Sequence, residues 1–353
     1  MTAVHVVVPD GIDDPARPSG GNSYDRQVCR ALAEIGWPVH VHAVPGAWPR
    51  PDAGAYAALA GVVQRIPDGA LALLDGLVAS TAPEVLVPQA SRLRLVPLVH
   101  MPLGQGKADS DARMREGAVL SAAISVVTTS AWSRRTLLDL YSLPGDRVHV
   151  AEPGVDAAPV SPGTTTGGAL LCVAAVIPGK GHDVLLDALA TMTDLSWECL
   201  CVGSMERDPA FAETLKRRLL DDGLGNRVRF TGPRIRADLE RSYLSADLLL
   251  LPSRAETYGM VVTEALARGL PVVAAEVGGV AEALGYGAGG IRPGLLVPPD
   301  DPAGLAAALR AWLGDAEVRL TWRRAARARR TSLSSGWSTT TSILASVLAE
   351  AAQ

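Results

Sequence analysis

The 353-residue chain has few cysteines, few aromatic residues and no strong charge of either sign. Its four cysteines are too few for a disulfide framework in a chain of this length, and no further ligands stand at the spacing of a cysteine metal site. We therefore interpret Cys29, Cys172, Cys199 and Cys201 as reduced thiols in the core. A formal charge of −4 gives no electrostatic reason to expect a nucleic acid partner.

Long apolar runs are also lacking, since none approaches the roughly 18 residues that are needed to span a bilayer. The first ten residues, MTAVHVVVPD, have neither the charged region nor the cleavage site of a signal peptide. Residues 1–150 have no concentrated basic face, so membrane contact should be peripheral at most. These features predict a cytoplasmic protein.

Short apolar strands alternate with longer amphipathic helices along the chain. The pattern begins with VHVVVP, followed by a helix that should stop at Gly36. Such alternation predicts an α/β protein with parallel sheets covered on both faces. The length exceeds one ordinary core, and the alternation breaks at SPGTTTGGA (161–169), which is typical of a linker. We therefore predict two doubly wound domains in tandem, residues 1–160 and 161–335.

The tail, residues 336–353, carries an apolar stripe. Leu344, Val347 and Leu348 repeat at helical spacing, so one face should be buried. The pattern predicts a final helix that packs on another surface of the protein.

Two glutamates flank a helix start in PSRAETYGMVVTEALARGLPVVA, residues 252–274. The helix should begin near Tyr258 or Gly259, after the strand ADLLLL, where open parallel sheets bind ligands. Its first amides favour an anion, and each carboxylate could accept hydrogen bonds from a vicinal diol. A phosphate with hydroxyls beside it indicates a nucleotide sugar. The alternative is that Glu256 and Glu264 merely suit the helix dipole.

A lysine follows the first strand of the second half, in VAAVIPGKGHD. A P-loop is excluded, because Ala174 stands where the first glycine is required and Gly181 stands where Ser or Thr is required. Lys180 could still neutralise a pyrophosphate, although a solvated loop lysine is the alternative.

The first half has two comparable features. Gly20 and Gly21 follow the first strand and open a helix, which makes an anion-binding turn. His100 ends a strand, although a single histidine is more often structural. If the two sheets face each other, all these features should line a cleft between domains, where small ligands usually bind.

Together these residues resemble the retaining glycosyltransferases of family 4, which have the GT-B fold. The specific element is E-x7-E from Glu256 to Glu264 in its sequence context. Support comes from Gly20-Gly21, His100, the KGHDVLL run from Lys180, PGVD at 153–156 and GWS at 336–338. The resemblance implies two Rossmann-like domains that face a cleft. The N-terminal domain would bind the acceptor and the C-terminal one the nucleotide sugar, and residues 336–353 would cross back onto the N-terminal domain.

The resemblance also implies roles for residues. Glu256 would contact the hydroxyls of the donor sugar, Glu264 would hold the ribose diol and Lys180 would bind the diphosphate. His100 would lie near the sugar and the acceptor. The backbone would supply the remaining contacts, from Gly20 and Gly21 to the phosphate and from Thr257, Tyr258, Gly259 and Met260 to the sugar and phosphate. Arg234 and Ile235 are candidates for contact with the base.

Two positions depart from the family pattern. Ala175 stands where the family often has an arginine, and Arg254 is the candidate to replace its charge. Thr257 stands where a glycine often follows the first glutamate.

The implied activity is transfer of a hexosyl group from a nucleoside diphosphate sugar, with retention of anomeric configuration. The donor, UDP- or GDP-linked, is a co-substrate, and no separate cofactor is expected. No acidic pair stands out as a metal site, so we expect no metal requirement. The acceptor should be a small molecule or a glycan. Two alternatives remain: a GT-B epimerase that acts on a nucleotide sugar, and a non-catalytic sugar-nucleotide-binding protein.

Overall fold

The computed structural model describes residues 2–14, 18–105 and 110–353. The chain forms two compact units. The first unit contains the described residues of 1–14 and 19–154 together with Trp337–Gln353, and the second contains Val155–Gly336 with Pro18. The chain thus passes from the first unit to the second after Gly154, whereas the sequence analysis places this boundary after residue 160.

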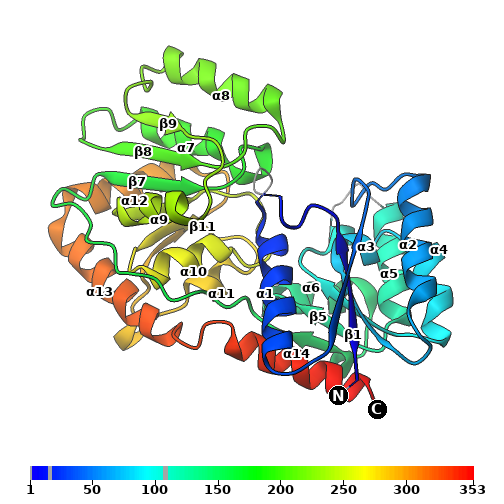
Figure 1. The fold of residues 1–353 in the computed structure, drawn as a ribbon. Helices are drawn as coiled ribbons and strands as arrows, with labels where there is room; N and C mark the ends of the chain where they lie inside the picture. The colour runs from blue at the N-terminus through cyan, green and yellow to red at the C-terminus, as the bar shows by residue number, and fades with distance from the viewer. Residues whose placement is uncertain (1, 15–17, 106–109) are drawn as a thin grey trace. The chain divides into compact units, whose positions relative to one another are not determined.

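The first unit is built on a parallel sheet of six strands (Figure 1). The strand order is β2-β1-β3-β4-β5-β6. In chain order the strands are β1 (Val4–Pro9), β2 (Val39–Val44), β3 (Leu71–Asp75), β4 (Arg94–Val99), β5 (Val126–Thr128) and β6 (Val148–Val150). The apolar runs of the sequence form the central strands β3 and β4, because side chains on both of their faces are buried, whereas the edge strand β2 is largely exposed.

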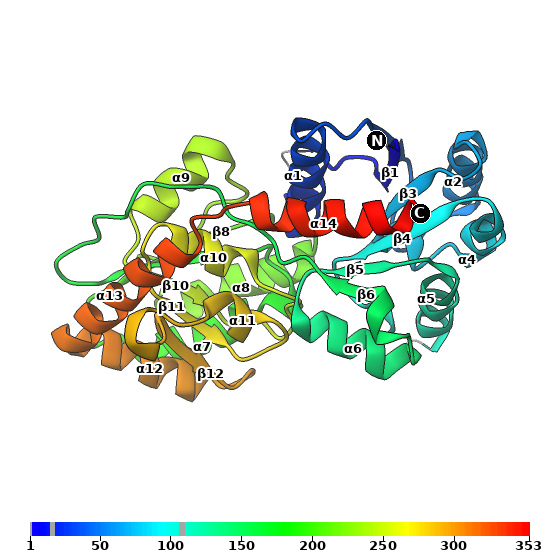
Figure 2. The same ribbon diagram turned by 90° about the horizontal axis from the view of Figure 1, so that it is seen from below.

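Helices cover both faces of this sheet. Val6 and Val8 pack with α1 (Gly20–Glu34) and α14 (Ser338–Ala351), which lie side by side (Figure 2). Val7, on the opposite face, packs with a group of helices: α2 (Ala53–Arg65), α3 (Gly76–Ala79), α4 (Pro83–Leu86), α5 (Ser110–Ala122) and α6 (Ala131–Tyr141). The stripe on the tail, Leu344, Val347 and Leu348, is buried in the α1 layer.

The ends of the helices follow from local chemistry. Ser130 caps α6 by accepting from the amide of Ser133, and Gly36 ends the first helix region with a φ of 91°. The apolar run ALALLDGLVA, residues 70–79, could form one long strand, but the strand β3 ends at Asp75. The Asp75 carboxylate accepts from the amides of Leu77 and Val78 at 2.8 and 3.3 Å and thereby starts α3.

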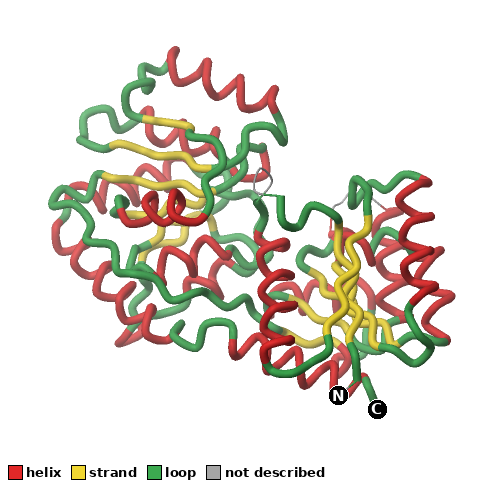
Figure 3. Tube along the Cα trace, in the orientation of Figure 1, coloured by secondary structure: helices red, strands yellow, loops and turns green. Residues whose placement is uncertain are grey.

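The second unit repeats this architecture (Figure 3). Its strand order is β12-β11-β10-β7-β8-β9. The strands are β7 (Ala169–Val173), β8 (Glu198–Val202), β9 (Val228–Phe230), β10 (Leu248–Leu251), β11 (Val272–Ala275) and β12 (Gly294–Val297), and all neighbours are parallel. The expected α/β fold with two doubly wound sheets is therefore confirmed.

Helices again lie on both faces. One layer contains α7 (His182–Ala190), α8 (Pro209–Asp221) and α12 (Pro302–Gly314). The other contains α9 (Arg236–Leu244), α10 (Met260–Ala267), α11 (Val280–Leu284) and α13 (Ala316–Ser332). The four cysteines are free thiols, and Cys172, Cys199 and Cys201 are buried. Across the described residues, no helix is both long and apolar enough to traverse a bilayer.

The segment predicted as a linker, 161–169, is held by the second unit. Ser161 donates to the carbonyls of Leu244 and Ala246, and the amide and hydroxyl of Thr164 each donate to Asp247 at 2.6 Å. Asp247 is fully buried and also pairs with Arg323 at 2.7 Å. The composition of this segment correctly indicates irregular structure. Its hydrogen-bond partners lie about 80 residues away in the sequence, so the local sequence cannot predict that the segment is held in place.

Candidate functional site

The loops after β7 and β10 bring Lys180 and Glu256 together. Lys180 ends a short 3₁₀ turn, Pro178–Lys180, and Glu256 precedes α10. The Lys180 Nζ atom lies 2.6 Å from Glu256 Oε1, and Ser253 Oγ donates to the same oxygen at 2.8 Å. The two side chains are 27% and 12% exposed, so they form a partly buried ion pair at the carboxyl edge of the sheet.

Two glycines permit the close approach of these loops. A Cβ on Gly181 would lie 2.0 Å from the carbonyl oxygen of Pro252, and one on Gly278 would lie 1.5 Å from that of Glu256. Both residues also have positive φ, at 67° and 54°. Gly278, in the loop after β11, is a site residue that the sequence analysis misses, since an isolated glycine carries no pairing information.

Helix α10 begins directly beside this ion pair. Gly259, with a φ of 90°, is the N-cap residue before Met260, and as a glycine it has no side chain to cap the helix start. Amides at such a start can serve an anionic ligand, because they have no partner within the helix. Thr257 is partly exposed beside them, whereas the Tyr258 side chain is buried in the core.

Glu264 lies farther along α10. Its Oε2 accepts a hydrogen bond of 2.6 Å from the hydroxyl of Tyr243, and the guanidinium of Arg268 stacks 4.5 Å from the centre of the Tyr243 ring. Burial raises the pKa of Glu264, while the Tyr243 hydrogen bond and Arg268 act in the opposite direction. One carboxylate oxygen is thus engaged by Tyr243, and the group is held in a defined orientation.

Arg254 is tied into the protein by two carboxylates. It pairs bidentately with Asp183 at 2.8 and 2.9 Å and contacts Asp300 at 2.6 Å. The hydrogen bond that Arg254 donates to Asp183 is the main cause of the raised pKa of Arg254. The charge of Arg254 is therefore balanced by carboxylates of the second unit. Position 175 is an alanine and supplies no positive charge.

The two candidates for base contact follow β9. Arg234 donates to the hydroxyl of Ser242 at 2.9 Å. Ile235 stands at the start of α9, where it is 38% exposed. The structure therefore offers an apolar surface at Ile235 and a guanidinium already oriented by α9.

The first unit places His100 between two buried carboxylates. Its Nε2 lies 2.7 Å from Asp25 Oδ1 and 3.6 Å from Asp75 Oδ2. Gly20 and Gly21 open α1, and a Cβ on Gly21 would lie 3.3 Å from the His100 ring, so imidazole and glycine turn are neighbours. The sequence analysis misses both aspartates. The one available signal is that Asp25 lies on the buried face of α1, with Tyr24, Val28 and Leu32.

Electrostatic interactions in this cluster favour the protonated forms of His100 and Asp75. Burial alone lowers the pKa of His100, but the charge and hydrogen bond of Asp25, with a contribution from Asp75, raise it overall. Burial raises the pKa of Asp75, and the neighbouring Asp25 adds to this effect. Asp25 Oδ2 is buried without a hydrogen-bond partner among the described residues. The cluster is thus a hydrogen-bonded ion pair with one acceptor atom unused.

Known proteins resemble this chain along most of its length. The family model for group 1 glycosyl transferases matches residues 167–315. The D-inositol 3-phosphate glycosyltransferase of Kineococcus radiotolerans is 33% identical over 293 residues, which cover 73% of this chain and 67% of that protein. The chain belongs to the group 1 glycosyl transferase family. A second relative, D-inositol 3-phosphate glycosyltransferase 1 of Catenulispora acidiphila, is 34% identical, with 75% of this chain and 66% of that protein covered. The chain thus spans about two thirds of the length of these relatives.

Solved structures show that this group 1 glycosyl transferase has the GT-B fold. Sucrose-phosphate synthase from Thermosynechococcus elongatus matches with a TM-score of 0.78 and 22% identity, over 99% of each chain. Anabaena HepE, solved in complex with UDP-glucose, also matches with a TM-score of 0.78, at 20% identity, over 99% of this chain and 100% of that one. The predicted fold class is confirmed.

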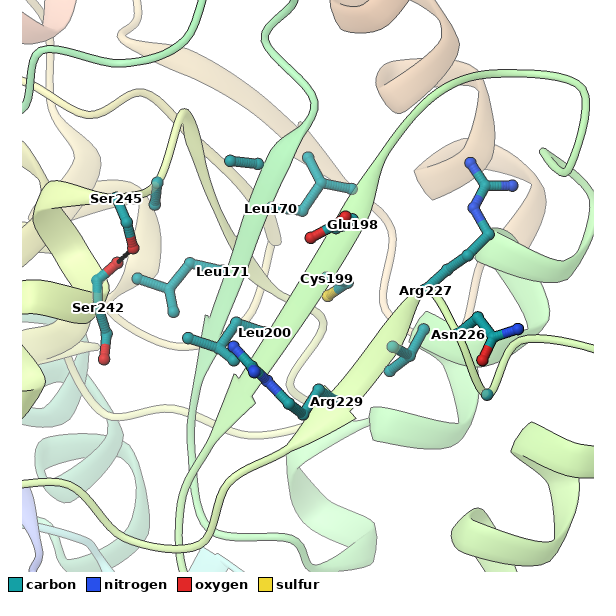
Figure 4. Close-up of a pocket in the computed structure, with 14 residues that line it drawn as sticks. Leu170, Leu171, Glu198, Cys199, Leu200, Asn226, Arg227, Arg229, Ser242 and Ser245 are labelled. Carbon is teal, nitrogen blue, oxygen red and sulfur yellow. Dashed lines mark hydrogen bonds between the residues drawn. The ribbon is translucent and has the colours of Figure 1, made fainter.

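The second unit also contains a hollow of about 570 Å³ (Figure 4). It opens between β7, β8, β9 and the end of α9, with Glu198, Asn226, Arg229, Ser242 and Ser245 among its lining. None of the predicted site residues lines it. Ligands of open parallel sheets bind beyond the carboxyl ends of the strands, which is where the loops that carry Lys180 and Glu256 lie.

Proposed function

We propose that this group 1 glycosyl transferase moves a glycosyl group from a nucleoside diphosphate sugar to a hydroxylated acceptor, with retention of configuration and without a metal. The observation that carries the proposal is the Lys180–Glu256 ion pair beside the uncapped start of α10. This arrangement offers a cation and amides for a diphosphate, and a carboxylate for sugar hydroxyls, at one edge of a sheet.

Lys180 and the α10 amides would bind the diphosphate. An ammonium group has three donors, so Lys180 can keep its bond to Glu256 and still donate to a phosphate oxygen. The diphosphate gains negative charge as the glycosidic bond breaks, and preoriented cations and amides stabilise that charge. Thr257, Gly259 and Met260 would contribute through their backbone, and Tyr258 would anchor the turn in the core.

Glu256 and Glu264 would bind hydroxyl groups. Glu256 is oriented by Lys180 and Ser253 toward the donor sugar, and Glu264, held by Tyr243, would accept from the ribose diol. Arg234 and Ile235 would flank the base. Arg254 would act indirectly, because its ion pair with Asp183 and its hydrogen bond to the carbonyl of Pro178 join the loop that carries Glu256 to the segment that carries Lys180.

The first unit would supply Gly20, Gly21 and His100 for the phosphate, the sugar and the acceptor. Asp25 and Asp75 would be positioning residues that orient the His100 ring and favour its protonated form. The leaving phosphate would receive the proton of the acceptor hydroxyl on the same face of the sugar.

A screen of donors and acceptors tests the function. HepE was solved with UDP-glucose, so UDP-glucose leads a thermal-shift series of UDP-, GDP- and ADP-sugars. D-inositol 3-phosphate is the first acceptor to assay, because the relatives of this chain are named for it. Transfer that yields product of the same anomeric configuration, in the presence of a chelator, supports the proposal in full.

Other outcomes distinguish the alternatives. An epimerised nucleotide sugar formed from donor alone would identify an epimerase. A thermal shift with a donor, but no turnover with any acceptor, would identify a non-catalytic binding protein. One observation favours this second alternative: Arg254 is neutralised and Ala175 provides no cation.

A further inference from the structure

A buried glutamate of the first unit, Glu116 on α5, accepts four hydrogen bonds although none of its surface is exposed. The hydroxyl of Ser80 donates to Oε1 at 2.8 Å, and the amide of Leu103 donates to the same oxygen at 3.0 Å. The amide of Gly104 donates to Oε2 at 2.9 Å, and the hydroxyl of Tyr141 donates to it at 2.6 Å. Both oxygens of this buried carboxylate are therefore satisfied by the protein.

The two amides belong to the loop that follows β4, which His100 opens. They lie at the 3₁₀ turn Leu103–Gln105. The two hydroxyls come from elsewhere, since Ser80 follows α3 and Tyr141 ends α6. Each oxygen of Glu116 thus accepts from one amide of the loop and from one hydroxyl of a neighbouring element. The carboxylate joins the loop that carries His100 to the helices behind it.

The fit of this loop to the helices is close. A Cβ on Gly104 would lie 2.0 Å from the Tyr141 hydroxyl and 2.9 Å from Arg113 Cα. Burial raises the pKa of Tyr141, and the Glu116 carboxylate adds to this effect, so the phenol remains a hydrogen-bond donor. The turn is therefore held against α5 and α6 at a distance that only a glycine permits.

The same loop presents an apolar side chain. Met101, which directly follows His100, is 48% exposed. Both residues lie beyond the carboxyl end of β4, where ligands of an open parallel sheet bind. A surface that is already ordered loses less conformational freedom when a ligand binds to it.

We propose that Glu116 is a positioning residue for acceptor binding, which fixes residues 100–105 so that His100 and Met101 form a preformed contact surface for the acceptor. Glu116 itself would touch no substrate. An acceptor with an apolar face next to its reacting hydroxyl would suit the exposed methionine. The inference rests on the proposed function, because that function assigns the acceptor to the first unit.

The variant Glu116→Gln separates the loop from the rest of the network. A glutamine nitrogen can donate but not accept, and each carboxylate oxygen of Glu116 serves one loop amide. In either orientation of the new side chain, one loop amide therefore loses its partner, whereas a hydroxyl can rotate and accept instead. We expect the KM for the acceptor to rise on the order of tenfold, with the KM for the donor unchanged.

Ser80→Ala is the matched control, because it removes a hydrogen bond to the same carboxylate and leaves both loop amides paired. It should lower the melting temperature and leave the KM for the acceptor unchanged. If Ser80→Ala raises that KM as much as Glu116→Gln does, or if Glu116→Gln raises both KM values equally, the glutamate serves only the fold and the proposal is wrong.

A surface variant covers the case in which Glu116→Gln fails to fold. Met101→Ala should raise the KM for the acceptor at unchanged melting temperature, whereas Met114→Ala, at a residue of α5 that is 67% exposed, should change neither. Unchanged acceptor kinetics in Met101→Ala would overturn the proposal while the unaltered protein still transfers the sugar. Absence of transfer by the unaltered protein would instead contradict the proposed function, and this inference with it.

Discussion

The two units of this glycosyl transferase place their charged groups in different ways. In the second unit, Lys180 and Glu256 stand on loops that glycines allow to touch, and both side chains remain partly exposed. In the first unit, His100 is held between Asp25 and Asp75, whose side chains are 2% and 4% exposed. One arrangement leaves its charged groups partly accessible, and the other surrounds a single ring with carboxylates.

This difference indicates a division of labour. Partly exposed ions can exchange partners when a ligand arrives, so the second unit suits the binding of a charged donor. Buried ions are costly to separate, since removal of one partner leaves an uncompensated charge. The first unit is therefore suited to hold one group in one orientation and one protonation state.

Removal of the exchangeable cation should have the largest effect. Lys180→Met should lower kcat on the order of 10²- to 10³-fold, as loss of one oriented donor to a developing anion does in other enzymes. Steady-state kinetics with the donor identified by the screen measures the effect.

Lys216→Met is the matched control, because this exposed lysine of α8 makes only a long contact of 3.9 Å with Glu213. Equal activity of the two variants would show that Lys180 does not act on the diphosphate.

The contact between loops should be the next most sensitive feature. Gly278→Ala places a methyl group against the carbonyl of Glu256 and must displace the loop. Gly289→Ala is the control, since it has a similar positive φ of 71° but no atom within 4 Å. The control should lose only about 1–2 kcal/mol of the free energy of unfolding, which is the cost of a residue with a Cβ in the left-handed region. Urea unfolding measures this loss.

Gly278→Ala should lose more stability than Gly289→Ala, and transfer activity as well. Equal losses of stability in the two variants would show that the contact with Glu256 does not constrain the loop.

The two sites also differ in how well the sequence alone predicts them. Glu256, Gly259 and Glu264 lie within one short segment after an apolar strand, so spacing and helix-start chemistry identify them together. The partners of His100 are 75 and 25 residues away, and only the sheet order brings β3, β4 and α1 to one point. The hydrogen bonds from the amides of Thr164 and Ala169 to Asp247 are equally non-local. Apolar periodicity predicts the layers, whereas buried polar partners depend on tertiary contacts.

Glu264 offers a smaller test of the second unit. Glu264→Gln keeps the shape but removes the charge that would accept from a ribose diol. Charged hydrogen bonds contribute about 1.5–3 kcal/mol each, so the KM for the donor should rise on the order of tenfold to a hundredfold. kcat should change less.

Tyr243→Phe is the companion variant, because it removes the 2.6 Å hydrogen bond to Glu264 and keeps the ring. It should raise the KM by less than Glu264→Gln does. A larger effect in Tyr243→Phe would indicate that Glu264 serves the fold and not the donor.

The buried cluster of the first unit should show its effect through pH. The folded state raises the pKa of both His100 and Asp75, so each binds its proton more tightly when folded. Their contribution to stability is therefore fully present below the unfolded pKa values, about 6.5 for histidine and 3.9 for aspartate, and is lost as pH rises through the folded values. Urea unfolding of the unaltered protein should give a stability that declines from about pH 4 to about 7 as Asp75, with a folded pKa of about 7, loses its proton, and that declines further above about pH 6.5 as His100 does.

Asp25→Asn should flatten the His100 part of that decline and reduce the Asp75 part, because the Asp25 charge raises the pKa of His100 and adds to the effect of burial on the pKa of Asp75. It should also move the pH profile of kcat/KM if His100 takes part in transfer. Asp68→Asn, which alters an exposed aspartate paired with Arg92, should leave both profiles unchanged. If Asp25→Asn shifts stability equally at every pH, the aspartate only packs in the core, and the contrast between an exchangeable and a locked charge site does not hold.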